Sequence, residues 1–196
     1  MFRPWFGRAL CVGIGIICIV AAVGLLVRDG LHALPALPFL ALVAGTCWAV
    51  FWRPEVAVDD GGVRLVNVLR TIDVPWPAIL AIDTKWALTL VTAYGRFTAW
   101  AAPAPGIHEA IRATKRDAQD LPESTFTAEG IRPGDLPSSS SGGAAMVIRR
   151  RLQELRDSGY LENPQLEHER APVTWHVATI VGGVVLAMLA AVAVFA

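Results

Sequence analysis

The sequence predicts an α+β membrane protein that combines apolar helices with a small antiparallel β-barrel. Three observations predict this fold class. Apolar residues make up 54% of the 196 residues and charged residues only 17%, against roughly 25% charged in an average globular protein. The apolar residues gather in three uncharged runs, and short β-type runs separated by turn residues fill much of the polar region between them. The predicted parts are a transmembrane hairpin (1–52), a β-barrel with a closing helix (53–118), a linker (119–143), an amphipathic helix with a polar connector (144–172) and a transmembrane helix (173–196).

The three uncharged runs cover residues 9–27, 34–52 and 173–196. A helix needs about 20 apolar residues to cross a bilayer, and inside hydrocarbon a helix satisfies its own backbone groups. Pro35 and Pro38 fall in the first turn of the second run, where a missing N–H costs least. Residues 28–33 would then close a helical hairpin. A cleaved signal peptide is the alternative for the first run, but the run is long for one and no small-residue cleavage motif follows it.

Basic and aromatic residues give the same orientation. The hairpin tip carries only Arg28, offset by Asp29, while the opposite ends of the runs carry more arginines. Because basic residues favour the cytoplasmic side, we expect the N-terminus and residues 53–172 to be cytoplasmic and the C-terminus to lie outside the cell (inner) membrane. The basic residues are Arg3, Arg8, Arg53, Arg64, Arg70 and Arg170, and the aromatic residues at the same interface are Trp5, Phe6, Trp48, Phe51, Trp52 and Trp175.

Small residues recur within the runs and predict close helix packing. Small side chains let helix backbones approach each other in lipid, so these residues would join the spans to each other, to another protein or to a second copy. The candidates are Gly13, Gly15, Ala41, Gly45, Ala178, Gly182, Gly183 and Ala187. The cysteines, Cys11, Cys18 and Cys47, also lie in the runs, and their odd number and spacing do not suggest a disulfide framework or a zinc site.

Residues 53–101 predict six short strands at 55–58, 63–69, 72–75, 79–84, 87–92 and 96–101. β-Branched and aromatic residues dominate these segments. The Asp-Asp-Gly-Gly sequence at 59–62 and the Tyr-Gly pair at 94–95 predict turns between them. Strands joined by short turns imply antiparallel pairing in a small barrel or sandwich, and a helix at 106–118 would close the domain. Residues 119–143, rich in Pro, Gly and Ser, predict a flexible linker.

Several segments together resemble the bacterial PH-like domain of actinobacterial membrane proteins, the family named for the low-molecular-weight protein antigen 6. The segments are Arg53-Pro54-Glu55-Val56, Asp59 to Val63, Val66 to Thr71, Val74-Pro75-Trp76 with Ile79, Lys85 to Leu90, and Gly95-Arg96. The resemblance covers roughly residues 5–101 and implies a PH-like fold behind two membrane helices. A full PH domain has seven strands and six are predicted here, which leaves one strand short, split or absent.

The charges argue against recognition of a lipid headgroup by this domain. Clustered basic residues are needed to bind phosphates, yet residues 53–101 hold five basic and five acidic residues. A second helix is predicted at 144–158, with an apolar stripe of Ala144, Val147, Ile148, Leu152 and Leu155 that favours docking onto a protein surface. Its Arg149, Arg150 and Arg151 are candidate lipid-contacting residues, because arginines near a cytoplasmic leaflet attract anionic lipid.

No catalytic, cofactor or metal motif is present. The chain lacks a phosphate-binding P-loop, a zinc-protease motif and a nucleophile-elbow motif, and a formal net charge of zero disfavours binding to nucleic acid. We therefore expect a non-enzymatic protein in contact with the lipid bilayer. Its domain would bind or position a protein partner, or a second copy, within a membrane complex. A membrane-surface sensor of anionic lipid, and an enzyme or transporter component without a recognisable motif, are the alternatives.

Overall fold

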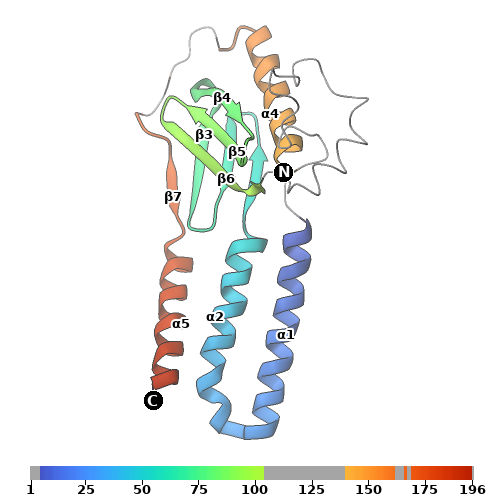
Figure 1. The fold of residues 1–196 in the computed structure, drawn as a ribbon. Helices are drawn as coiled ribbons and strands as arrows, with labels where there is room; N and C mark the ends of the chain where they lie inside the picture. The colour runs from blue at the N-terminus through green and yellow to red at the C-terminus, as the bar shows by residue number, and fades with distance from the viewer. Residues whose placement is uncertain (1–4, 104–139, 162–165, 167–168, 196) are drawn as a thin grey trace. The chain divides into compact units, whose positions relative to one another are not determined.

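The computed structural model describes residues 5–103, 140–161, 166 and 169–195 (Figure 1). The chain divides into two compact units. We call the first, within Glu55–Thr174, the sheet unit, and the second, formed by Pro4–Pro54 and Trp175–Ala196, the helical unit. Each is described by itself below.

The helical unit contains a helical hairpin and one further helix. Its elements are α1 (Trp5–Asp29), the 3₁₀ segment η1 (Gly30–Ala36), α2 (Leu37–Cys47), the π-helical turn η2 (Trp48–Trp52) and α5 (Val177–Phe195). A Cβ atom added to Gly7 would lie 3.3 Å from the carbonyl oxygen of Phe51, so the beginning of α1 lies against the end of η2. The two arms are therefore antiparallel, and α5 packs against α2 (Figure 1). Gly30, with φ +56°, allows the chain to leave α1.

The first arm and the connection are close to the sequence prediction, whereas the third apolar run differs. The helical stretch Trp5–Trp52 is long and apolar enough to cross a membrane, and an 18-residue segment within it has a mean hydropathy of 3.0. Val177–Ala193 is a shorter apolar helix. Helix α5 begins at Val177 rather than at residue 173, because Val173–Trp175 form strand β7. Val, Thr and Trp all favour strands, and β7 pairs with an edge of the sheet unit.

The sheet unit holds two antiparallel sheets. The first has the order β1-β2-β3-β7, with β1 (Glu55–Val58), β2 (Gly62–Val66) and β3 (Arg70–Pro75). The second has the order β4-β5-β6, with β4 (Ile79–Asp83), β5 (Ala87–Thr92) and β6 (Gly95–Pro103). The six predicted strands are confirmed, with β1 and β5 at the predicted bounds. The seventh strand is β7, which the sequence analysis assigned to a membrane span.

The prediction of a closed barrel is wrong for the described residues. The outer partner of β3 is β7 and not β4. The 3₁₀ turn η3 (Trp76–Ala78) follows β3, and Trp76 in it is flanked by Pro75 and Pro77. Neither proline has an N–H to donate, so the first sheet ends at this turn. Asn67 links the two sheets instead. Its Nδ2 donates to the carbonyl oxygen of Thr98 at 2.9 Å, and its Oδ1 accepts from the N–H of Trp100 at 2.8 Å.

Helix α4 (Ser140–Asp157) packs against β1, β5 and β6. Its buried residues, Ala144, Ala145, Ile148 and Leu152, belong to the same hydrophobic core as the strands. Four of the five predicted stripe residues therefore lie on or beside the core, and Val147 is exposed. Gly159, with φ +75°, lies just after the end of the helix. The predicted closing helix at 106–118 and residues 119–139 of the predicted linker lie outside the described residues.

Candidate functional site

The turn between β1 and β2 is fixed by its own side chains and by close packing. Asp59 Oδ1 accepts hydrogen bonds from the N–H groups of Gly61 at 3.0 Å and Gly62 at 2.9 Å. A Cβ atom on Gly62 would lie 2.1 Å from the carbonyl oxygen of Val74, so only glycine fits at this position. The predicted turn at 59–62 is confirmed, and its geometry places two adjacent carboxylates beside α4.

The buried side chain of Trp76 contacts this turn and holds it in place. The side chain is 1% exposed and is the largest in the core. Its indole Nε1 donates to the carbonyl oxygen of Asp59 at 3.1 Å, which satisfies a polar atom that would otherwise be buried without a partner. Trp76 therefore packs in the core of the sheet unit. In contrast, Trp86 is 82% and Trp100 58% exposed, so neither belongs to the core.

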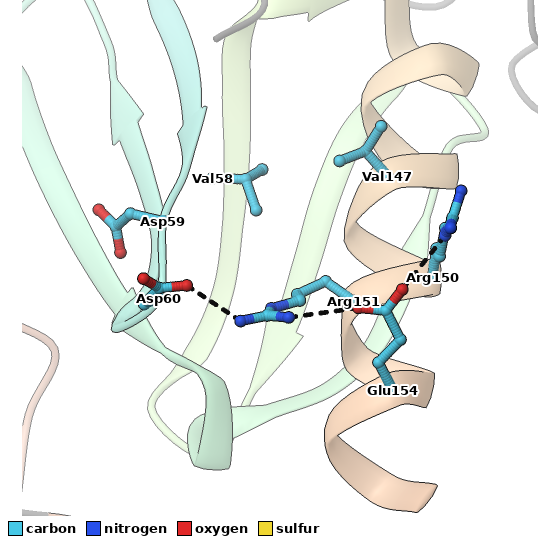
Figure 2. A pocket seen from close by; sticks show the side chains of 7 residues that line it. All are labelled: Val58, Asp59, Asp60, Val147, Arg150, Arg151 and Glu154. Carbon is cyan, nitrogen blue, oxygen red and sulfur yellow. Dashed lines mark hydrogen bonds and ion pairs between the residues drawn. The ribbon is translucent and has the colours of Figure 1, made fainter. Parts of the chain in front are cut away.

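A shallow hollow of about 390 Å³ lies between the turn and α4 (Figure 2). It contains three carboxylates and two guanidinium groups, so its formal charge is −1. The lining residues are Val58, Asp59, Asp60, Val147, Arg150, Arg151 and Glu154.

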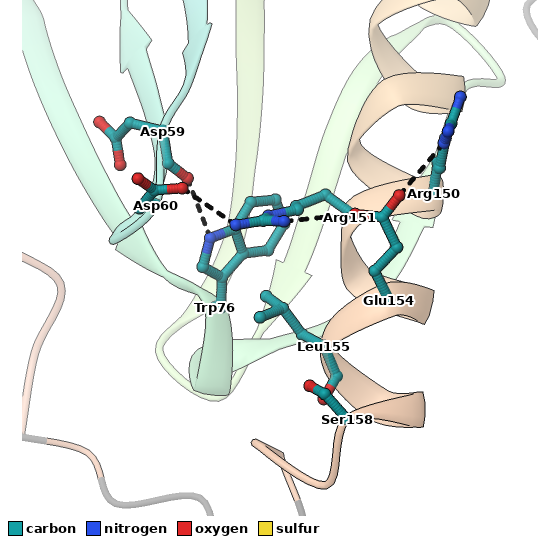
Figure 3. A network of polar contacts seen from close by, with 8 residues as sticks. All are labelled: Asp59, Asp60, Trp76, Arg150, Arg151, Glu154, Leu155 and Ser158. Atoms are coloured by element: carbon teal, nitrogen blue, oxygen red, sulfur yellow. Dashed lines mark hydrogen bonds and ion pairs between the residues drawn. The ribbon is translucent and has the colours of Figure 1, made fainter.

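The arginines of the hollow are occupied by carboxylates of the same unit (Figure 3). Arg151 lies 2.9 Å from Asp60 Oδ1 and 3.3 Å from Glu154 Oε2, and Arg150 Nε lies 3.2 Å from Glu154 Oε1. Hydrogen bonds from Arg151 and then Arg150 hold the pKa of Glu154 below its usual range, because they favour the ionised form. The network joins α4 to the β1–β2 turn and leaves no concentrated positive charge.

Two other arginines of the sheet unit also pair with carboxylates. Arg64 Nε lies 2.5 Å from Asp73 Oδ1, and this hydrogen bond raises the pKa of Arg64. Arg96 lies 3.3 Å from Asp83. Of the candidate lipid-contacting residues Arg149, Arg150 and Arg151, the first donates to the carbonyl oxygen of Ile82 at 3.4 Å and the other two form the ion pairs above.

The surroundings of the predicted packing glycines are open among the described residues. A Cβ atom on Gly13, Gly15, Gly45, Gly182 or Gly183 would meet no described atom within 4 Å. Gly7, which the sequence analysis did not select, is the glycine that lies against another helix. Packing of the predicted positions, which also include Ala41, Ala178 and Ala187, against another protein or a second copy stays a prediction.

The helical unit has a second arrangement of polar groups, near the beginning of α1. The guanidinium carbon of Arg8 lies 4.2 Å from the ring centroid of Trp52, and that of Arg53 lies 5.6 Å from the ring centroid of Trp48. Arg53 also donates to the hydroxyl of Thr179 on α5. From the sequence alone, the two arginines and the two tryptophans are predicted only to mark the orientation of the spans. The spacing of Trp48 and Trp52, one helical turn apart, is the signal that could have suggested their pairing with arginines.

The described residues contain no group of three or more His, Cys, Asp or Glu side chains placed to hold a metal ion. The hollow presents carboxylates and guanidinium groups that bind one another. Its arrangement suits the fixing of α4 on the sheets.

Comparison with known proteins supports the resemblance noted from the sequence. No curated protein and no solved structure gave a match. Residues 53–135 match the family model described as a bacterial PH domain, which includes all six strands of β1–β6. This part of the chain is therefore similar to bacterial PH domains.

Proposed function

We propose that the protein is a non-enzymatic integral membrane protein whose PH-like domain binds or positions a protein partner on the cytoplasmic side. PH-like domains serve as binding modules for proteins or lipids, and the match over residues 53–135 supports a binding role. The surface chemistry of the sheet unit indicates the class of partner, because it favours a protein over a lipid headgroup.

The ion pairing of the basic side chains is the observation that carries this choice. A phosphate site needs guanidinium or ammonium groups that can turn toward the ligand. In the sheet unit, Arg64, Arg96, Arg150 and Arg151 are each bound to a carboxylate of the same unit. An anionic headgroup would have to displace those carboxylates, so the alternative of an anionic-lipid sensor built on Arg149–Arg151 is disfavoured.

Exposed apolar side chains on the sheet unit support a protein contact. Leu80 on β4 is 60% exposed, and Trp86, at the turn to β5, is 82% exposed. Large aromatic residues contribute much of the binding energy at protein interfaces. The Lys85 ammonium lies 5.9 Å from the Trp86 ring centroid, which adds a positive charge beside this apolar surface.

The proposed topology places three spans in the cell membrane, formed by α1, by α2 with η2, and by α5. The apolar, exposed surface of the hairpin supports this proposal. The N-terminus and residues 53–172 would be cytoplasmic. A reporter fused after Ala196 should then be active outside the cytoplasm and one inserted at Ser139 inside it, whereas the reverse pattern would refute the orientation.

The partner role is tested by cross-linking in cells, followed by purification of the full chain in mild detergent. We expect a reproducible protein partner that is lost with Trp86→Ala and with Leu80→Ala but retained with Arg150→Gln. Retention in all three variants would place the contact elsewhere. Loss with Arg150→Gln alone, restored by anionic lipid, would favour the lipid-sensor alternative.

A further inference from the structure

The arginines of the helical unit differ from those of the sheet unit in what they bind. Arg8 lies over the indole of Trp52 and Arg53 over that of Trp48. Among the described residues, neither is ion-paired with a carboxylate. The helical unit has a single acidic residue, Asp29, and that carboxylate lies 3.6 Å from Arg28. The positive charges of Arg8 and Arg53 are therefore not neutralised within the unit.

Stacking on an indole leaves the binding edge of a guanidinium group available. A guanidinium group held over an indole ring carries its N–H donors in its own plane, where they can reach a ligand beside the ring. Arg53 uses one nitrogen for the hydroxyl of Thr179 and keeps its other donors. Two guanidinium groups fixed in this way can each offer paired N–H donors to phosphate oxygens.

The packing of the helical unit holds both arginines at one end of the hairpin. Gly7, next to Arg8, lies against Phe51, next to Trp52. Arg53 directly follows η2 and contacts α5 through Thr179, so α1, η2 and α5 all contribute to this end. Arg8 and Arg53 are half-buried, which limits the number of side-chain conformations lost on binding. Tryptophan rings prefer the headgroup level of a bilayer, where lipid phosphates lie.

We propose that Arg8 and Arg53, held on Trp52 and Trp48, form a binding site for the phosphate of an anionic phospholipid at the cytoplasmic face of the membrane. This inference rests on the proposed membrane integration but is independent of the protein partner. It assigns lipid recognition to the helical unit and not to the sheet unit. Phosphate oxygens accept from the guanidinium edges, while the acyl chains lie along the apolar surface of α1 and α2.

The test is native mass spectrometry of the full chain in mild detergent containing phosphatidylglycerol or phosphatidylcholine. We expect the wild-type protein to retain phosphatidylglycerol preferentially. Because a basic residue near an anionic leaflet contributes about a fivefold gain in affinity, Arg8→Gln and Arg53→Gln should each lower retention about fivefold. The matched control is Arg28→Gln, which removes an arginine at the opposite end of α1 and should leave retention unchanged.

Two further measurements keep the result interpretable. Thr179→Val removes the hydrogen-bond partner of Arg53 but leaves the charge of Arg53 in place. If lipid retention falls in Arg53→Gln but not in Thr179→Val, the charge of Arg53 and not a packing defect is the cause. Added inorganic phosphate should fail to compete with the lipid at equal concentration, because it lacks the acyl chains. Equal retention of both lipids, competition by inorganic phosphate, or an equal loss in Arg28→Gln would overturn the proposal. None of these outcomes would alter the reporter pattern or the partner capture described above.

Discussion

Substitution of Ile148 tests whether α4 belongs to the folded core of the PH-like domain. Ile148 is fully buried and belongs to the same hydrophobic core as the strands. In the sequence, residues 104–139 separate its helix from the last of strands β1–β6. Truncation of a buried Ile to Ala costs about 2–5 kcal/mol through lost burial and the cavity left behind. Since 1.4 kcal/mol is a factor of ten, Ile148→Ala should raise the undocked population of α4 by about thirtyfold or more.

Limited trypsin digestion measures this population, because Arg149, Arg150 and Arg151 are cleavage sites on the same helix. When opening is fast relative to cleavage, the rate follows the open population. The rate at these bonds should therefore rise about thirtyfold or more in Ile148→Ala. The matched control is Met146→Ala, since Met146 is 42% exposed and its truncation should change the rate less than about threefold. Equal rates in the two variants would show that α4 is not part of the core.

Three further predictions concern the turn, the link between the sheets and the ionic network. Gly62→Ala should lower the thermal midpoint of the full chain strongly, because the new Cβ would lie 2.1 Å from a backbone oxygen; an unchanged midpoint would contradict the close approach. Asn67→Ala removes two hydrogen bonds to β6, each worth about 1 kcal/mol, and should speed amide exchange at Trp100 by about tenfold. Glu154 has a lowered pKa, so its contribution to stability is present above the ordinary value of about 4.3 and is lost as pH falls through the folded-state pKa. The midpoint difference between the wild type and Glu154→Gln should therefore be clear at pH 7 and disappear under acid conditions, whereas a constant difference would refute the pairing.

Local sequence patterns were sufficient for most of the fold. The β-branched runs and the turns at 59–62 and 94–95 locate the strands, because alternation and glycine placement are local signals. The β5–β6 hairpin is an example. Gly95 has φ +116° in its turn. Thr92 Oγ1 accepts a hydrogen bond from the N–H of Tyr94 and donates one to the carbonyl oxygen of Gly95.

Long-range contacts were beyond the sequence patterns. The pairing of β7 with β3 joins residues about 100 positions apart in the sequence. The Val-Thr-Trp segment of β7 is also compatible with the beginning of an apolar span. Likewise, the barrel remains open because β3 pairs with β7 and not with β4. Asn67 bonds the backbone of β6 and links the two sheets, and nothing in the local pattern distinguishes that asparagine from an ordinary turn residue. The pairing of Arg151 with Asp60 was missed for the same reason.

The π-helical turn η2 determines on which side of the helix axis the next residue, Arg53, lies. In a continuous α-helix, residue 53 would lie roughly 140° around the axis from residue 48, since each residue adds about 100°. The bond from Arg53 N–H to the carbonyl oxygen of Trp48, 3.2 Å long, closes a wider turn and returns Arg53 to the side of Trp48. One additional residue in the turn thus determines which side chain faces the indole, and a single deletion between 48 and 52 would separate the pair without removing either member.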